Sequence, residues 1–182
     1  MKNTILIALI ICSFFTSTMA MPKGISANEV TRNHVNTISK MIKALQPELN
    51  KTDRNRIAYS LYMTTKKYKI DPKLMIAIIG TESDFRNEKV STTGDLSMAQ
   101  INASVWNKEF TRIGRDSLNS KRLKKDEGYA LSKMAEILII LKERHSKKDD
   151  KWFARYHSQT KKFKNLYSAK VEKRLRIIAS IN

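Results

Sequence analysis

The sequence is poor in the residues on which many enzyme classes depend, because its 182 residues include only 5 glycines, 3 prolines and 1 cysteine. The closest glycine pairs, Gly80 with Gly94 and Gly114 with Gly128, are 14 residues apart. That spacing excludes a Gly-rich phosphate-binding loop. Cys12 and three histidines form neither a CxxC nor an HExxH motif. We therefore expect no nucleotide-binding site, no metal site and no cofactor.

The first twenty residues have the pattern of a signal peptide. Lys2 precedes an apolar run over residues 5–15, and residues 18–20 place small side chains at the two cleavage positions. The run is shorter than the roughly 20 apolar residues that a membrane span needs. We predict cleavage after Ala20 and an exported protein, periplasmic or secreted. A lipid anchor on Cys12 is the alternative, although two bulky isoleucines precede this cysteine.

The remaining chain is long enough for one compact domain. Removal of 20 residues from 182 leaves 162, and because Lys2 is the only charged side chain lost, the net charge falls from +18 to +17. This part has no cysteine, so folding must depend on packing. A cysteine-free chain is compatible with an oxidising compartment.

Apolar residues recur at three- and four-residue steps along most of the chain, which predicts an all-α, mainly helical fold. A first helix is expected over residues 30–45, and Asp53 is expected to cap a second. Asp71 and Pro72 have the types that favour a helix start, and they precede the apolar run 74–79. A helix that is apolar on all faces is buried.

The second half is predicted to contain a loop followed by further helices. Polar residues dominate 84–94, short helical pieces are expected over 104–110, and a long amphipathic helix over 129–141. Asp150 is expected to cap the helix that follows. The final helix is predicted to bury one apolar stripe: Phe163, Leu166, Tyr167, Val171, Leu175 and Ile178.

Glu82 is the sharpest local anomaly, because it lies three residues beyond the apolar run 74–79. Burial at the rim of the core and the negative end of a helix both favour the protonated carboxyl. A neutral carboxylic acid near neutral pH is what a general acid needs. The alternative from position alone is a solvent-facing Glu82 paired with a lysine.

Three short segments together resemble the catalytic domain of soluble lytic transglycosylases, relatives of goose-type lysozyme. They are Glu82-Ser83-Asp84-Phe85, Gly94-Asp95-Leu96-Ser97-Met98-Ala99-Gln100-Ile101 and Ala154-Arg155-Tyr156-His157. In the family these are the Glu-Ser-x-Phe, Gly-x-x-Gly-Leu-Met-Gln-Ile and Ala-x-Tyr-Asn elements. The resemblance covers residues 68–160 and implies a lysozyme-like single domain.

The resemblance also implies site residues. It makes Glu82 the catalytic acid and base, Ser91 a polar contact to the reacting sugar, and Gln100 and Tyr156 residues of the glycan groove. Met98 and Ala99 would form part of the groove wall. Without the family pattern, Ser91 and Gln100 would be ordinary loop residues and Tyr156 a core residue with a satisfied hydroxyl.

The chain departs from the family pattern at three places. Ser97 replaces the second glycine, Met98-Ala99 stands for Leu-Met, and His157-Ser158 follows the tyrosine in place of Asn-Ala. These departures concern the fine geometry of the substrate more than the reaction.

The resemblance implies chemistry with one carboxylate. Hydrolysis of a glycosidic bond usually uses two carboxylates about 5 to 9.5 Å apart. Asp84 would point away from Glu82 on a continuing helix, and Glu88 and Asp95 lie in the predicted loop. A lytic transglycosylase instead lets the 6-hydroxyl of N-acetylmuramic acid attack C1, which forms a 1,6-anhydro end. A muramidase on the same fold is the alternative.

The positive charge concentrates at the C-terminus, where residues 151–182 hold nine Lys or Arg and one acid. Nucleic acid and a membrane surface could both attract such a segment. We favour attraction to anionic cell-wall polymers, because the aromatic residues fit the predicted core stripe and the signal peptide indicates export. We expect no nucleic acid, no stable membrane insertion and a monomer.

The sequence thus predicts a signal peptide at 1–20, an N-terminal helical segment at 21–65 that packs on the domain, and a lytic transglycosylase-like catalytic domain at 66–182. The expected partner is the peptidoglycan glycan strand. A non-catalytic cationic wall-binding protein is the remaining alternative.

Overall fold

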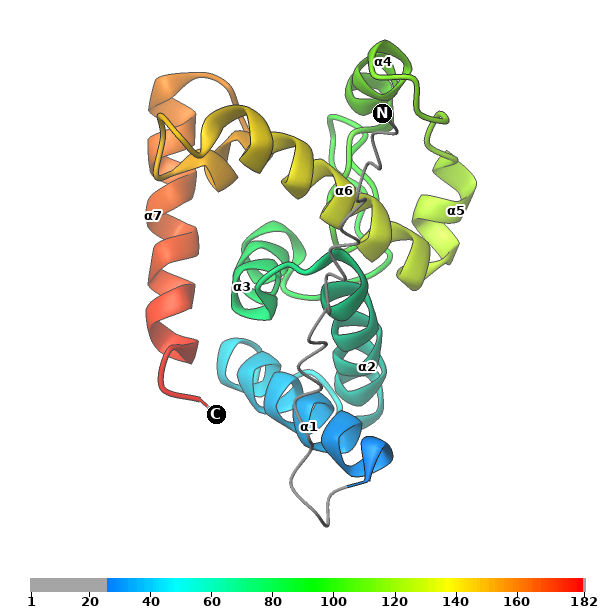
Figure 1. Cartoon of the computed structure of the whole chain (residues 1–182), viewed down its shortest axis with the longest axis vertical. Coiled ribbons are helices and arrows are strands. Elements are labelled where there is room, and N and C mark those ends of the chain that lie inside the picture. The colour runs from blue at the N-terminus through cyan, green and yellow to red at the C-terminus, as the bar shows by residue number, and fades with distance from the viewer. Residues whose placement is uncertain (1–25, 182) are drawn as a thin grey trace, which may run out of the picture.

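The computed structural model describes residues 26–181, which form helices and no β-strand (Figure 1). The α-helices are α1 (Ala27–Leu45), α2 (Lys51–Tyr68), α3 (Pro72–Ser83), α4 (Ala103–Arg112), α5 (Ser120–Lys125), α6 (Glu127–His145) and α7 (Lys161–Ile178). A 3-10 helix, η1 (Trp152–Tyr156), precedes α7. The prediction of an all-α fold is confirmed. The predicted signal peptide, residues 1–20, lies outside the described residues.

The buried helix α3 lies at the centre of the molecule, between α7 on one side and α1 and α2 on the other (Figure 1). It begins as predicted, because the Asp71 side chain accepts a hydrogen bond from the Lys73 backbone N–H at 2.8 Å and Pro72 occupies the first turn. Residues 75–80 are all buried. This helix therefore carries its last turn, with Glu82, to the rim of the core.

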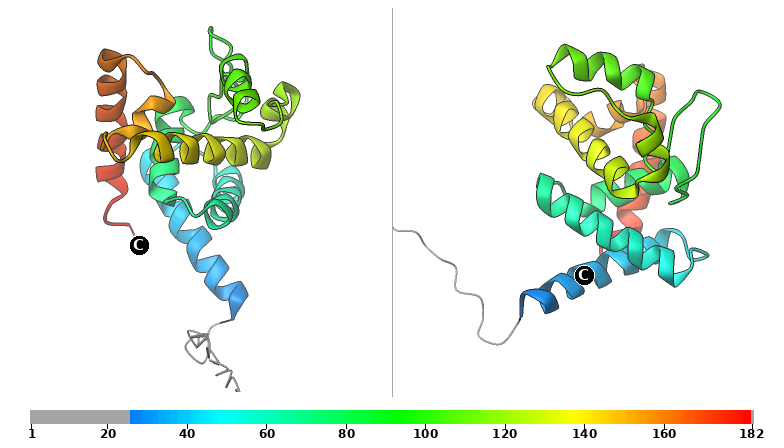
Figure 2. Two further views of the ribbon diagram at one scale, coloured as in Figure 1. Left: turned by 45° about the horizontal axis from the view of Figure 1, so that its top comes forward. Right: turned by 90° about the vertical axis from the view of Figure 1, so that its right-hand side faces the viewer.

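The two N-terminal helices share one hydrophobic core with the rest of the described chain. α1 packs on α2 and reaches α3 and α7, while α2 packs along α6. Both further views show α1 and α2 against the remaining helices (Figure 2). Helix α2 crosses the predicted boundary at residue 65 without a break.

Two predicted helix caps are wrong. The second helix begins after Asn50, whose side chain accepts from the Asp53 N–H at 2.9 Å, so Asp53 lies inside the first turn. Ahead of η1, the carboxylate that accepts a backbone N–H, from Lys151 at 3.1 Å, belongs to Asp149 and not to Asp150. Asn50 thus reaches the free N–H groups of α2 before Asp53 can, whereas η1 begins after Lys151 without a side-chain cap. The short helix α5 was not predicted.

The predicted apolar stripe of the last helix is also partly wrong. Phe163 and Leu166 are 53% and 56% exposed, whereas Tyr167, Val171 and Ile178 are buried. A helix at the edge of a small domain buries only part of a wide apolar face. In α7 the buried stripe begins at Tyr167 and continues through Val171 to Ile178.

Gly80 allows α3 and α7 to approach closely. A β-carbon at this position would lie 3.2 Å from a guanidinium nitrogen of Arg174 on α7 and 3.4 Å from the Phe85 ring. The same guanidinium pairs with Asp84 at 2.9 Å. Within residues 26–181, none of the helices combines the length and apolar character that crossing a membrane requires.

Candidate active site

Glu82 lies in the last turn of α3, and its side chain is 11% exposed. The helix ends directly after it, because Asp84 and Phe85 adopt left-handed backbone conformations with φ of 50° and 64°. Such values are uncommon for residues other than glycine, and they turn the chain away sharply. The carboxyl group is therefore left at the edge of the core, close to solvent but mostly covered.

The surroundings of Glu82 favour its protonated form. Burial raises its pKa to about 7, while a hydrogen bond from the Tyr167 hydroxyl to Oε1, 2.7 Å long, acts in the opposite direction. The charge of Asp95 raises the pKa further, and those of Lys89 and Lys170 lower it. The structure therefore places Glu82 at the rim of the core and not in solvent, and burial there favours the neutral carboxyl. Its catalytic role stays a prediction.

His157 and Tyr167 are close to Glu82, although the sequence alone does not indicate either of them as a site residue. Their rings stack at 4.7 Å with an angle of 4°, and Nδ1 of His157 lies 4.0 Å from Glu82 Oε1. Burial and the charge of Lys170 lower the pKa of His157. Tyr167 was assigned to the core stripe, and His157 was noted only as a departure from the family pattern.

Asp95 presents a second, differently held carboxylate. One oxygen accepts hydrogen bonds from the hydroxyls of Ser91 and Thr93 at 2.6 and 2.7 Å, and the other from the Asn102 amide at 2.9 Å. Although burial raises its pKa, these hydrogen bonds together bring the pKa below the ordinary value. Ser91 therefore holds Asp95 in this structure.

The segment between α3 and α4 is predicted as a loop over 84–94, and the structure confirms it. The segment is folded around isolated bridges of Leu96 with Val90 and Ile101. Ser97 and Gln100 have φ of 68° and 48°. Ser97 thus occupies a left-handed conformation at the position where the family pattern has glycine, which explains why glycine suits that position.

Gln100 ties this loop together. Its amide nitrogen donates to the carbonyl oxygens of Lys89 at 3.0 Å and Ser97 at 2.8 Å. The Lys89 ammonium group in turn donates to the carbonyl oxygen of Glu82. Lys89 thus links Gln100 to the end of α3. The Gln100 side chain is partly exposed.

Met98, Ala99 and Tyr156 form a buried layer behind this loop. Met98 and Ala99 have no exposed surface, and Tyr156 is 8% exposed. The Ser83 hydroxyl donates to the Met98 carbonyl oxygen, and the Tyr156 hydroxyl donates to that of Ala99 at 2.7 Å. The Tyr156 hydroxyl is thus satisfied within the protein, as its core interpretation expects.

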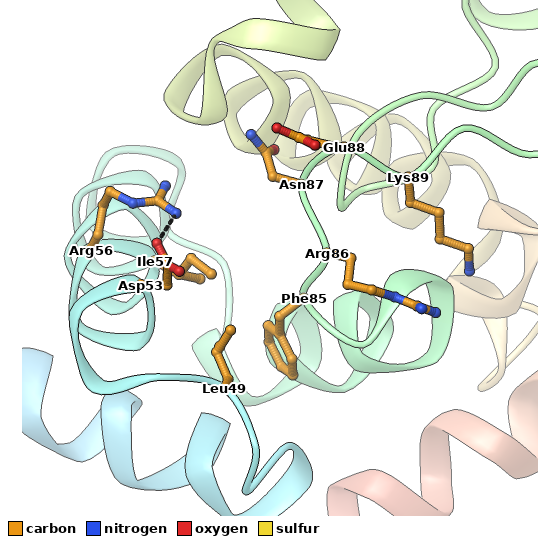
Figure 3. Close-up of a pocket in the computed structure, with 9 residues that line it drawn as sticks. All are labelled: Leu49, Asp53, Arg56, Ile57, Phe85, Arg86, Asn87, Glu88 and Lys89. Carbon is orange, nitrogen blue, oxygen red and sulfur yellow. Dashed lines mark hydrogen bonds and ion pairs between the residues drawn. The ribbon is translucent and has the colours of Figure 1, made fainter.

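The remaining carboxylates near α3 face other partners. Asp84 pairs with Arg174, and Glu88 is exposed in a pocket of about 670 Å³ between α2 and residues 85–89 (Figure 3). Figure 3 shows Arg86 and Lys89 extending away from Arg56, on the far side of the loop. In the described part of the chain, no group of three or more His, Cys, Asp or Glu could hold a metal ion.

Comparison with known proteins identifies one family. The family described as "Transglycosylase SLT domain" matches residues 60–154, which is just over half of the chain. The matched segment contains Glu82, Ser91 and Gln100 and ends shortly before Tyr156. Among curated proteins, the sequence has no significant match.

Proposed function

The chain belongs to the transglycosylase SLT domain family, and on this basis we propose that it is a peptidoglycan lytic transglycosylase with Glu82 as its acid and base. Membership explains the all-α, lysozyme-like fold and assigns the chain a transglycosylase-type function on peptidoglycan glycan strands. The proposal adds the reaction product and the residues. The observation that carries it is a Glu82 side chain that is 11% exposed, with a pKa of about 7.

In the proposed reaction, protonated Glu82 gives its proton to the glycosidic oxygen between N-acetylmuramic acid and N-acetylglucosamine as the bond to C1 breaks. The resulting carboxylate takes the proton of the muramoyl 6-hydroxyl, whose oxygen bonds to C1. No water is consumed, and Glu82 ends protonated again. Because the nucleophile belongs to the substrate, its effective concentration is high.

The state of Asp95 supports the transglycosylase over the muramidase. A muramidase needs a second carboxylate as base or nucleophile. Both oxygens of Asp95 already accept hydrogen bonds from Ser91, Thr93 and Asn102, and its pKa is lowered. A carboxylate held in this way is a weak base. Its charge instead keeps a proton on Glu82.

Mass spectrometry of digested sacculi tests the proposal. A transglycosylase releases fragments with anhydro ends, which are lighter by one water than the reducing ends made by a muramidase. Glu82→Gln should release neither, while Glu88→Gln, which changes an exposed carboxylate on the loop after α3, should behave as wild type. Reducing ends would establish the muramidase, and no fragments from the wild-type protein would point to a silent wall-binding protein.

Ser91, Gln100 and Tyr156 stay proposed as residues around the glycan, and so do Met98 and Ala99 behind them. Export to the periplasm or the medium is likewise proposed, on the signal pattern of residues 1–20. N-terminal sequencing of protein recovered outside the cytoplasm should give Met21 as the first residue. An intact Met1 on that protein would contradict cleavage.

A further inference from the structure

Helix α7 leaves three large apolar side chains about half exposed. Phe163, Leu166 and Ile177 are 53%, 56% and 46% exposed. Both figures that show the whole molecule place α7 at its edge, and it packs by one side on α3, α1 and η1 (Figures 1 and 2). Exposed apolar residues that gather on one element indicate an interaction surface.

These residues lie on one line along the helix. The sequence separations between Phe163, Leu166, Lys170, Lys173 and Ile177 are three and four residues, so the five side chains follow one face. We call them the outer stripe of α7. The stripe runs about 21 Å along the helix axis, at 1.5 Å per residue.

The outer stripe lies in a strongly positive surface. The exposed cations of α7 are Lys161, Lys162, Lys170, Lys173 and Arg176. The only acid of the helix, Glu172, accepts a hydrogen bond from Ser168 and pairs with Lys151. An occupant of this surface must therefore be anionic, and it must also cover apolar side chains.

Charge and chemistry distinguish between the possible occupants. A second copy of the helix would place Lys170 and Lys173 against like charges, at the positions that a helix pair buries. A bare glycan or an anionic polymer would account for the lysines but would gain little from Leu166 and Ile177. An anionic phospholipid surface accounts for both, because apolar side chains enter the boundary between headgroups and acyl chains while cations stay at the phosphates.

We propose that the outer stripe of α7 binds peripherally to an anionic phospholipid surface. The helix would lie along the surface with Phe163, Leu166 and Ile177 inserted and Lys173 and Arg176 at the headgroups. This binding requires no spanning helix. It can be tested separately from the proposed reaction, because of the stripe residues only Lys170 acts on the pKa of Glu82, through its charge, and Lys170 is left unchanged in the variants below.

Vesicle flotation tests the proposal with the purified protein. It should float with vesicles of phosphatidylglycerol and phosphatidylcholine and not with phosphatidylcholine alone. Replacing Lys162, Lys173 and Arg176 with Gln should weaken binding roughly 100-fold, since each cation near an anionic surface contributes about fivefold. Replacing Lys40, Lys43 and Lys51, exposed cations of α1 and α2, removes the same charge as a control and should change binding much less.

The apolar part has its own test. Leu166→Ser with Ile177→Ser should reduce vesicle binding at least tenfold, because the variant loses two of the three large apolar side chains that the stripe inserts. Val105→Ser, a similarly exposed residue of α4, is the matched control. The proposal is overturned if the double variant binds vesicles as wild type does. Equal effects of both triple variants, or binding to isolated sacculi without binding to vesicles, would also overturn it.

Discussion

Glu82 and Asp95 occupy neighbouring regions of the site that are built in different ways. Glu82 ends a buried helix, where the last turn offers carbonyl oxygens and no free N–H groups. Asp95 lies in a loop whose Ser91, Thr93 and Asn102 side chains all donate to it. Burial therefore dominates the pKa of Glu82, whereas for Asp95 the hydrogen bonds together outweigh the effect of burial and lower the pKa. A helix end suits proton transfer, and a polar loop suits a fixed negative charge.

Removing the acid from the helix end should have the largest effect. Glu82→Gln should lower glycan cleavage by roughly 100- to 10,000-fold, because the amide cannot donate the proton that the leaving oxygen needs. Release of soluble fragments from sacculi measures it, and circular dichroism should show an unchanged fold. Near-wild-type cleavage by the pure variant would remove Glu82 from the reaction.

Glu82→Gln should also reveal how much the buried Glu82 lowers the free energy of unfolding when it ionises. The folded-state pKa of Glu82 is about 7 against an ordinary value of 4.5, so the folded protein binds more protons than the unfolded chain between these pH values. Its stability must therefore fall as pH rises from about 4.5 to 7, by about 3 kcal/mol.

Glu82→Gln lacks this titration. Urea unfolding gives the free energy of unfolding of both proteins. The difference, variant minus wild type, should increase by about 3 kcal/mol between pH 4.5 and pH 8. Other groups titrate equally in both proteins and cancel in the difference. Parallel curves would mean that Glu82 is not desolvated.

Tyr156→Phe should loosen the connection between the Asp95 loop and η1. Its hydroxyl donates to the buried Ala99 carbonyl oxygen, and an unpaired buried acceptor costs about 1 to 3 kcal/mol. Thermal unfolding should show this loss of stability, whereas Tyr59→Phe, with a half-exposed ring, should lose much less. Unchanged stability with reduced turnover would contradict this structural role and would support Tyr156 as a residue that contacts the glycan.

Tyr167→Phe should increase the difference between the pKa values of Glu82 and Asp95. The Tyr167 hydroxyl favours the ionised form of Glu82, so its removal raises the pKa of Glu82. Activity that depends on protonated Glu82 declines as pH rises through this pKa. The decline in kcat/KM should therefore move to higher pH, by about one unit. An unmoved decline would show that Tyr167 does not act on the acid.

Asp95→Asn should remove the fixed negative charge from the loop and should cause the smallest change in the pKa of Glu82. The charge of Asp95 raises the pKa of Glu82, so the uncharged amide should lower it and move the same decline to lower pH by less than one unit. The pH profile of kcat/KM measures this as well. A loss as large as that of Glu82→Gln would identify Asp95 as the second carboxylate of a muramidase.

The long helices could be predicted because periodicity and start signals agree, as at Asp71 and Pro72. Where two polar residues compete for one cap, as Asn50 does with Asp53, the sequence alone does not decide. Periodicity also could not show which apolar residues of α7 are buried and which are exposed. Phe163 and Leu166 belong to the same predicted stripe as Tyr167, but of these three only Tyr167 is buried.

The site was predictable where local order decides it and not where distant segments meet. Glu82 follows from its place at the end of an apolar run. Tyr167 lies 85 residues further along the chain and reaches Glu82 only through the packing of α7 on α3. The hydrogen bonds around Asp95 depend on loop conformations that no periodicity encodes.

The absence of a side chain at Gly80 lets Arg174 of α7 pack closely against the end of α3. Tyr167 and Arg174 are seven residues apart, so α7 presents both to the end of α3, one to Glu82 and the other to Asp84. A methyl group at residue 80 would lie 3.2 Å from a guanidinium nitrogen of Arg174, so this side chain would have to shift by a few tenths of an ångström. The same guanidinium pairs with Asp84, two residues beyond Glu82. Gly80→Ala would therefore reach the site through a single arginine and its ion pair, although residue 80 carries no functional group of its own.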